Sequence, residues 1–264
     1  GIMSGLNLNF DITGELEYIK SAMMARSGRD FAASRGEYLN SLILAKYLGF
    51  DFIDAENVIF FKDNGSFDEE KTNEAMKAEL KKHKNAVIPG FYGSMPNGTI
   101  KTFTRGGSDI TGSIVARASN ADLYENWTDV SGFLMADPRI VKDPLPISTV
   151  TYRELRELSY MGAGVLHEDS IFPVQKEGIT INIRNTNHPE DEGTLIVPNM
   201  YTDANEHLIT GVAGKKGFSV INIEKNRMGG EFGFAARVFK CLDNYAIHTE
   251  HLASGIDTMS HIVS

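Results

Sequence analysis

Apolar side chains recur at helical spacing near the start of the chain. Residues 15–25 and 38–48 each place them three or four positions apart, which predicts two helices with one buried stripe each. The stripes consist of Leu16, Ile19 and Met23 and of Leu39, Leu42, Ile43 and Tyr47. Gly49 predicts the end of the second helix, because glycine readily adopts the left-handed conformation that closes a helix.

Predicted strands and helices alternate as far as about residue 197. Short apolar runs predict strands at residues 58–61, 86–88, 123–127 and 179–183, and helical patterns predict helices at 68–82, 111–119 and 151–161. This alternation predicts an α/β domain with a mainly parallel sheet. Ligands of such sheets bind at the carboxyl ends of the strands, so we expect functional residues in the loops there.

The pattern changes after Pro198. A polar connector at 201–206 precedes a strand at 218–224, a turn at 229–230, a helix at 232–245 and strands at 246–252 and 259–263. This βαββ order indicates a second, small unit. We therefore expect two domains, at residues 1–200 and 208–264.

Composition and charge narrow the class of protein. Hydrophobic residues make up 42% and charged residues 23%, which is ordinary globular usage and argues against a disordered chain. The net charge of -9 argues against non-specific nucleic-acid binding, which needs a basic face. No apolar run approaches the roughly 20 residues that span a bilayer. We expect neither a nucleic-acid nor a membrane partner.

The cysteine count bears on the compartment. Cys241 is the only cysteine, so no internal disulfide can form, which fits a reducing cytosol. The first residues also lack the pattern of a signal peptide. We expect a cytoplasmic protein, with Cys241 as a small buried residue of a helix.

The block Thr104-Arg105-Gly106-Gly107-Ser108-Asp109 is the first candidate for chemistry. Its glycines let the backbone approach a ligand closely, and Arg105 offers a planar fork for a carboxylate or phosphate. Asp109 could orient a nucleophile or a metal. The alternative is a plain turn with Asp109 as the N-cap of the following helix.

A second candidate follows the strand predicted at 123–127. Thr128 and Asp129 stand where that strand ends, and Arg139 follows in the loop Ala136-Asp137-Pro138-Arg139. A hydroxyl and a carboxylate there could hold a base or ribose, and Arg139 could reach phosphate charge. The alternative is ordinary turn chemistry, since Ser-Gly and Asp-Pro pairs are frequent in loops.

A third candidate is Ser34-Arg35-Gly36-Glu37. Ser34 with Glu37 three residues later fits a capping box, or Glu37 could pair with a ligand ammonium. The histidines indicate no metal site: His248 and His251 are expected on opposite faces of one strand, with no third ligand.

Seven motifs, taken together and in order, resemble those of the aspartokinases. They are Ser34-Arg35-Gly36-Glu37, Gly90-Phe91-Tyr92-Gly93, Arg105-Gly106-Gly107-Ser108-Asp109, Trp127-Thr128-Asp129-Val130-Ser131-Gly132, Ala136-Asp137-Pro138-Arg139-Ile140-Val141, Gly162-Ala163-Gly164-Val165-Leu166-His167 and Asn185-Thr186. The resemblance runs from about residue 30 to the end. It implies an amino-acid-kinase fold, an αβα sandwich around a mainly parallel sheet, followed by a partial ferredoxin-like ACT domain.

The resemblance also implies roles for individual residues. Glu37 would hold the aspartate amino group, Arg105 and Ser108 would grip its carboxylates, Phe91 would line the pocket, and Asp109 would act near the reacting carboxylate. The nucleotide-binding positions would be Thr128, Asp129, Arg139, Gly164 and Val165. An effector amino acid would contact Met228, Glu231 and Phe234. The residues themselves suggest that the N–H groups of Gly229 and Gly230, before the predicted helix, receive its carboxylate and that Glu231 meets its ammonium. The alternative is that the two glycines only make the turn and Glu231 complements the helix dipole.

Three departures from the family pattern stand out. Aspartokinases begin with a strand leading into Lys-Phe-Gly-Gly, whose lysine neutralises the transferring phosphoryl group, and this segment is absent here, so we expect an incomplete chain. Gly164 and Glu168 replace a lysine and a proline of the family, and Leu134 replaces a tyrosine near the adenine. The chain also ends within the first of two expected ACT units.

The resemblance implies an ATP-dependent aspartate kinase, which catalyses the first step of lysine, threonine and methionine biosynthesis. ATP with Mg²⁺ would be the co-substrate, with no protein metal site and no tightly bound cofactor. Lysine or threonine would be the effector, and the ACT units would make the protein a homodimer or larger. Two alternatives remain open: a related kinase acting on glutamate or another acid, and an inactive amino-acid-binding regulatory subunit.

Overall fold

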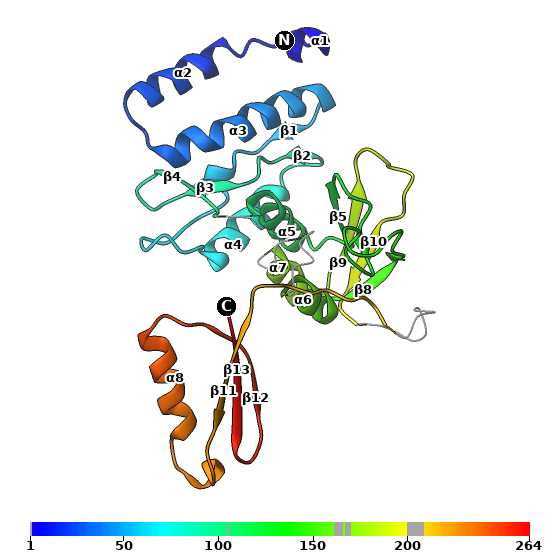
Figure 1. Ribbon diagram of the computed structural model, residues 1–264. Helices are drawn as coiled ribbons and strands as arrows, with labels where there is room; N and C mark the ends of the chain where they lie inside the picture. Colours follow the sequence, from blue (N-terminus) through cyan, green and yellow to red (C-terminus); the bar gives the residue numbers. More distant parts are fainter. Residues whose placement is uncertain (1, 105, 161–165, 167–169, 200–208) are drawn as a thin grey trace. The chain divides into compact units, whose positions relative to one another are not determined.

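Two units make up the chain in the computed structural model. The structure describes residues 2–104, 106–160, 166, 170–199 and 209–264. The units are Gly1–Ala213 and Gly214–Ser264, and Figure 1 traces their elements in sequence order. The first contains mixed strands and helices, so the predicted α/β class is confirmed.

Three helices open the first unit: α1 (Ile2–Gly5), α2 (Thr13–Met24) and α3 (Arg29–Leu48). Gly49 ends α3 as predicted, with a left-handed φ of 66° and its N–H bonded to the carbonyl of Ala45. Of the first predicted stripe only Ile19 is buried, while Leu16 and Met23 are about half exposed.

Helix α3 begins nine residues earlier than predicted. Gly28, with a φ of 97°, precedes it, and Phe31 in its first turn is buried. Ser34 therefore lies inside the helix, where its hydroxyl donates to the carbonyl of Phe31 at 2.8 Å. The capping-box interpretation of Ser34 and Glu37 is wrong, because the amides of an interior turn already have helical partners.

The next segment builds one hydrophobic core. Its elements are β1 (Asp51–Phe52), a 3-10 turn η1 (Ala55–Asn57), α4 (Glu69–Leu80), β2 (Ala86–Val87), β3 (Tyr92–Ser94) and β4 (Ile100–Thr102). Strands β1 and β2 pair parallel, whereas β3 and β4 pair antiparallel. The predicted strand at 58–61 is wrong: these residues enter the core but make only isolated bridges from Phe60 to Ser94 and from Phe61 to Phe67.

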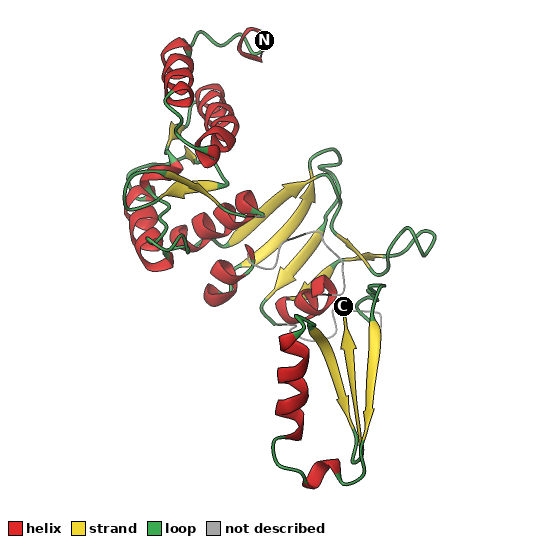
Figure 2. Cartoon of the chain, turned by 60° about the vertical axis from the view of Figure 1, so that its left-hand side comes forward, coloured by secondary structure: helices red, strands yellow, loops and turns green. Residues whose placement is uncertain are grey.

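A four-stranded sheet carries the second core. It consists of β5 (Leu123–Thr128), β9 (Thr180–Asn185), β10 (Thr194–Val197) and β8 (Thr149–Thr151), in that spatial order. The pairs β5–β9 and β8–β10 are parallel, and β9–β10 is antiparallel. A short antiparallel pair, β6 (Phe133–Leu134) with β7 (Pro146–Ile147), stands outside it, and Figure 2 shows these strands with the helices beside them.

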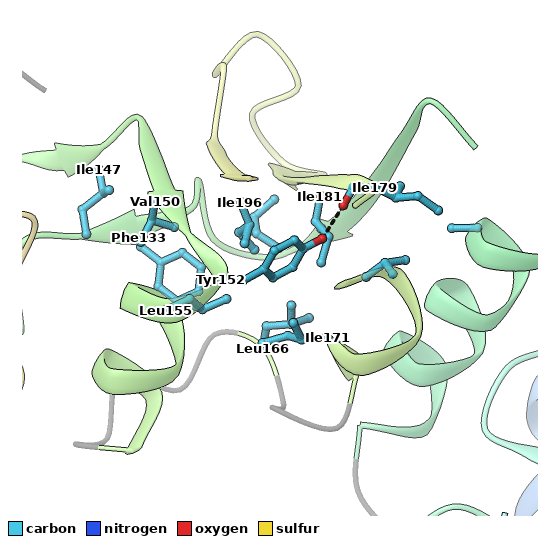
Figure 3. Packing of buried hydrophobic residues seen from close by; sticks show 13 residues of the cluster. Phe133, Ile147, Val150, Tyr152, Leu155, Leu166, Ile171, Ile179, Ile181 and Ile196 are labelled. Atoms are coloured by element: carbon cyan, nitrogen blue, oxygen red, sulfur yellow. Dashed lines mark hydrogen bonds between the residues drawn. The ribbon is translucent and has the colours of Figure 1, made fainter. Parts of the chain in front are cut away.

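Side chains from α5 (Gly107–Ser119), α6 (Tyr152–Tyr160) and α7 (Phe172–Glu177) pack with this sheet. Figure 3 shows the cluster around Tyr152, whose hydroxyl donates to the carbonyl of Ile179. Helix α5 belongs to both cores, since Ala116 packs in this cluster and Ile110 and Ile114 pack in the other. This double anchoring fixes the start of α5, which carries Ser108 and Asp109.

The second unit has the predicted βαββ order. It consists of β11 (Ser219–Glu224), a 3-10 turn η3 (Met228–Gly230), α8 (Phe234–Asn244), β12 (Thr249–Ser254) and β13 (Thr258–Val263), and the strands pair antiparallel in the order β11-β13-β12. Cys241 lies on α8 but is exposed, so its predicted burial is wrong; Leu242 is the buried residue of the helix. His248 precedes β12, so the expectation that it shares a strand with His251 is also wrong.

Candidate functional site

The loop before β3 packs directly against the start of α5. A Cβ placed on Gly90 would lie 2.9 Å from the Cα of Ser108, and one on Gly107 would lie 2.9 Å from the Cα of Phe91. Real Cβ atoms essentially never approach backbone so closely, so both positions require glycine. The two segments thereby bring Phe91 and Ser108 together, although the sequence separates them by 17 positions.

Phe91 holds an unusual backbone conformation in this contact. Its φ is 82°, which non-glycine residues seldom adopt. Its N–H donates to the hydroxyl of Thr111 on α5 at 3.2 Å, and its carbonyl accepts from the N–H of Phe103 at 2.9 Å. Strained residues persist only where their surroundings over-determine them, and here both backbone groups of Phe91 are engaged.

Asp109 lies in the first turn of α5 and not at its cap. Gly106 is the N-cap, so the interpretation of Asp109 as an N-cap is wrong. A side-chain amide of Asn126 on β5 donates to Asp109 Oδ1 at 2.9 Å, and the hydroxyl of Tyr124 donates to its carbonyl at 3.3 Å. Burial raises the pKa of Tyr124 to about 12, so this hydroxyl remains a donor.

Asn126, which is only 9% exposed, is a site residue that no sequence motif indicated. One feature of the sequence could have indicated it: the amide side chain of Asn126 lies on the same face of the predicted strand as Tyr124. Asn126 ties the start of α5 to β5, the strand that ends at Thr128. Two residues along a strand span roughly 7 Å, so the carboxylate of Asp109 is held close to the carboxyl end of β5.

Thr128 and Asp129 stand at that strand end, as predicted. The Thr128 hydroxyl donates to Asp129 Oδ1 at 3.2 Å, and Asp129 is exposed. Ser131 anchors the loop behind them: its hydroxyl donates to Asp191 Oδ2 at 2.5 Å and accepts from the Asn185 amide at 2.9 Å. The loop is therefore fixed at Ser131, while Asp129 remains open to a ligand.

Arg139 lies on an exposed turn and already has an anionic partner. Its guanidinium contacts Asp137 at 2.6 Å, and its side chain is 86% exposed. Hydrogen bonds from Arg139 hold the pKa of the Asp137 carboxyl at about 2. In the described part of the chain no hydrogen bond joins Arg139 to Thr128 or Asp129.

Among the described residues, Glu37 is not tied to this cluster. Glu37 is exposed on α3, and within the described ranges its side chain has no hydrogen bond or ion pair to Phe91, Ser108 or Asp109. Arg105, Gly164 and Val165 lie outside the described residues.

The predicted effector loop differs from expectation. Helix α8 begins at Phe234, with Gly233 as its N-cap, so Gly229 and Gly230 do not stand at its N-terminus. The N–H groups of Gly230 and Glu231 are already bonded to the carbonyls of Arg227 and Met228. The sequence indicated one turn before the helix, but the 3-10 turn at Met228–Gly230 is followed by a second turn that ends at Gly233. Gly229 and Gly230 are therefore separated from the helix.

Glu231 is also engaged within its own unit. Lys225 and Arg237 both form ion pairs with its carboxylate, and these cations lower its pKa. Met228 is buried and Phe234 is half-buried, with the Lys225 ammonium 5.5 Å from the centre of the Phe234 ring.

Neither a metal cluster nor a membrane-spanning helix is found among the residues that the structure covers. Groups of three or more His, Cys, Asp and Glu suited to a metal ion are absent there. No helix in these ranges has the length and apolar character needed to cross a bilayer.

The first unit is an α/β domain in which Asn126 ties the start of α5 to β5, and comparison with known proteins identifies its family. The model of the amino acid kinase family matches residues 4–185. The chain therefore belongs to the amino acid kinase family.

Within this family the chain is similar to aspartokinases. It is 39% identical over 246 residues to aspartokinase 3 of Bacillus subtilis, covering 89% of this chain and 53% of the relative. It is 31% identical over 240 residues to the chloroplastic aspartokinase 1 of Arabidopsis thaliana, covering 86% of this chain and 42% of the relative. The chain thus spans about half the length of these relatives.

A solved structure gives the same likeness. The aspartate kinase of Clostridium acetobutylicum, described as an allosteric enzyme, superposes with a TM-score of 0.91 at 56% sequence identity. The match covers all of this chain and 60% of that one.

Proposed function

We propose that this chain is part of an aspartate kinase, which transfers the γ-phosphoryl group of ATP to the side-chain carboxylate of L-aspartate. The hydrogen bond from Asn126 to Asp109 carries the proposal, because it ties the acceptor block on α5 to the strand that ends at Thr128. Acceptor and nucleotide would meet at this edge of the sheet, where α/β folds bind their ligands. Similarity to aspartokinases supports aspartate as the acceptor.

The proposed step needs no covalent enzyme intermediate. One oxygen of the substrate carboxylate attacks the γ-phosphorus in line, the bond from that phosphorus to the β–γ bridging oxygen breaks, and 4-phospho-L-aspartate and ADP are formed. Such transfer depends mainly on positioning and charge stabilisation. In this proposal Glu37 holds the aspartate ammonium, Arg105 and Ser108 hold its carboxylates, and Phe91 forms the wall of the pocket.

Asp109 would lie near the reacting carboxylate. Its own carboxylate is fixed by Asn126 and would stay aligned during the step. Thr128, Asp129, Arg139, Gly164 and Val165 would bind the nucleotide. Mg²⁺ bound to the ATP phosphates would neutralise charge on them, which needs few protein ligands because Mg²⁺ usually keeps several waters.

Regulation is a second part of the proposal. The units at about residues 1–200 and 208–264 would be catalytic and regulatory, and pairing of the regulatory units would make the protein a homo-oligomer. Lysine or threonine bound near Met228, Glu231 and Phe234 would inhibit by preferring one of two enzyme states.

The effector ammonium would have to replace Lys225 or Arg237 at Glu231. Glu231→Ala should therefore relieve inhibition by lysine and leave the uninhibited rate unchanged.

Calorimetric titration and ADP release test the central proposal. The chain is titrated with aspartate, with glutamate and with a non-hydrolysable ATP analogue, and ADP release is followed with ATP and each acid. We expect aspartate and the analogue to bind, with Asp109→Ala abolishing any release of ADP. Preference for glutamate would indicate a different acceptor. Aspartate binding that survives Asp109→Ala, with no ADP release from the wild-type chain, would indicate the regulatory-subunit alternative.

A further inference from the structure

Arg35 is a buried cation on α3 without a carboxylate partner among the described residues. Only 4% of its surface is exposed. Its Nε and Nη2 groups both donate to the hydroxyl of Ser34, at 3.1 and 3.0 Å, and the described ion pairs do not include it. Burying an unpaired charge is costly, so something else in the surroundings must stabilise the guanidinium.

Three aromatic rings surround this guanidinium. Its central carbon lies 4.5 Å from the ring centre of Phe31, 4.8 Å from that of Tyr38 and 5.1 Å from that of Tyr92. A cation within about 6 Å of a ring centroid is attracted by the negative face of the ring, and more strongly when desolvated. Phe31 and Tyr38 belong to α3, one turn to either side of Arg35, whereas Tyr92 belongs to β3. We call these three rings the aromatic cage.

The hydroxyl of each tyrosine in the aromatic cage is hydrogen-bonded to a carboxylate. The Tyr92 hydroxyl donates to Asp54 Oδ1 at 2.7 Å, and the Tyr38 hydroxyl donates to Glu15 Oε2 at 2.8 Å. Burial, followed by these acceptors, raises the pKa of both tyrosines, so their hydroxyls remain donors. The aromatic cage therefore carries a carboxylate at each of its two tyrosine hydroxyls.

The cage joins two segments that carry candidate substrate residues. Glu37 follows Arg35 by two positions on α3, and Phe91 directly precedes Tyr92. Phe91 in turn contacts the start of α5 through Gly107. A shift of α3 relative to β3 would move Glu37 relative to Phe91.

We infer that Arg35 is a positioning residue of the acceptor site, which fixes the helix carrying Glu37 to the strand that follows Phe91. This inference rests on the proposed function for its ligand, aspartate. In this role Arg35 acts through its positive charge, which the rings attract, and not only by filling space between α3 and β3. Losing the charge should therefore weaken aspartate binding and leave nucleotide binding unchanged.

Two substitutions separate charge from volume. Arg35→Met keeps a long apolar side chain and removes the charge, and Arg35→Lys keeps a charge that the rings can still attract. Lys71→Met is the matched control. The ammonium of Lys71, on α4, lies 4.1 Å from the ring centre of Phe60, so this substitution removes a cation–ring contact outside the aromatic cage. Aspartate and the ATP analogue are titrated into each variant, and amide hydrogen exchange is measured over residues 88–94 and over β11 as an internal reference.

We expect Arg35→Met to weaken aspartate binding about tenfold, with nucleotide affinity within about twofold of wild type. Exchange at Phe91 to Ser94 should become about tenfold faster while β11 is unchanged. Arg35→Lys should recover most of both losses, and Lys71→Met should show neither.

Several outcomes would overturn the inference. Wild-type aspartate affinity in Arg35→Met, equal loss for both ligands, or a loss in Arg35→Lys as large as that in Arg35→Met would each show that the charge of Arg35 does not position the acceptor site. If the wild-type chain binds no aspartate, the proposed function fails. In that case amide hydrogen exchange at residues 91–94 alone tests the inference. Unchanged exchange in Arg35→Met would show that Arg35 does not link α3 to β3.

Discussion

The two candidate ligand segments of the first unit are built in different ways. On the proposed acceptor side, Gly90 and Gly107 allow backbone-to-backbone packing that leaves no room for a methyl group, and Phe91 is held by hydrogen bonds at both its N–H and its carbonyl. On the proposed nucleotide side, Asp129 and Arg139 are exposed, and Arg139 is paired with its neighbour Asp137. The first segment is shaped by the cores, whereas in the second Arg139 would have to leave Asp137 before it could bind an anionic ligand.

The largest expected effect comes from the acceptor side. Arg105→Lys keeps the charge but loses the planar fork that binds a carboxylate through two hydrogen bonds. A charged hydrogen bond contributes about 1.5–3 kcal/mol, so kcat/KM for aspartate should fall about ten- to a hundredfold, with ATP binding nearly intact. Steady-state kinetics with each substrate varied measure this, and an unchanged aspartate KM would contradict the assignment.

Gly107→Ala tests whether packing shapes the acceptor side. The new Cβ would meet the Cα of Phe91 at 2.9 Å, and neither backbone can move freely. We expect a loss of about 1–3 kcal/mol in the free energy of unfolding, together with weaker aspartate binding. Chemical denaturation measures the loss.

Gly14→Ala on α2 is the control for that substitution. Nothing lies within 4 Å of a Cβ at Gly14, which is in a helix. Alanine there should stabilise the chain by roughly 0.5–1 kcal/mol. Equal effects of the two substitutions would show that the approach of Gly107 to Phe91 is not tight.

Asp129→Ala tests the separation of the two segments from the nucleotide side. Because Asp129 is exposed beyond β5 and Ser131 anchors the loop, the substitution should leave the fold intact. Affinity for an ATP analogue should fall about tenfold, as expected for a charged hydrogen bond, while aspartate affinity is kept. Calorimetry with both ligands distinguishes this from an equal loss, which would indicate misfolding.

The smallest expected effect comes from releasing Arg139. Asp137→Asn removes the negative charge but keeps an oxygen that can accept from the Arg139 N–H, a contact of 2.8 Å. An exposed ion pair contributes about 0.2–1 kcal/mol, so nucleotide affinity should rise about 1.4- to fivefold. The gain should shrink at high salt, because salt screens exposed charges. A loss of affinity would show that Asp137 itself supports the nucleotide.

The sequence by itself determined most of the described helices, about half of the described strands and the identity of the family. Helical spacing placed α4, α5 and α6 to within a few residues, and the βαββ order of the second unit emerged from apolar runs alone. These elements depend on local pattern and on stop signals such as Gly49, which act over one or two turns. The motifs that resemble aspartokinases are also contiguous, so they can be found without a fold.

Only the tertiary structure decided how distant residues combine. The start of α3 depends on the burial of Phe31, residues 58–61 became core without a strand, and Glu231 acquired Lys225 and Arg237 as partners. Asn126 became important only when α5 was packed beside β5. Contacts of this kind depend on how the elements pack, and their energy comes from burial and charge pairing that no local pattern contains.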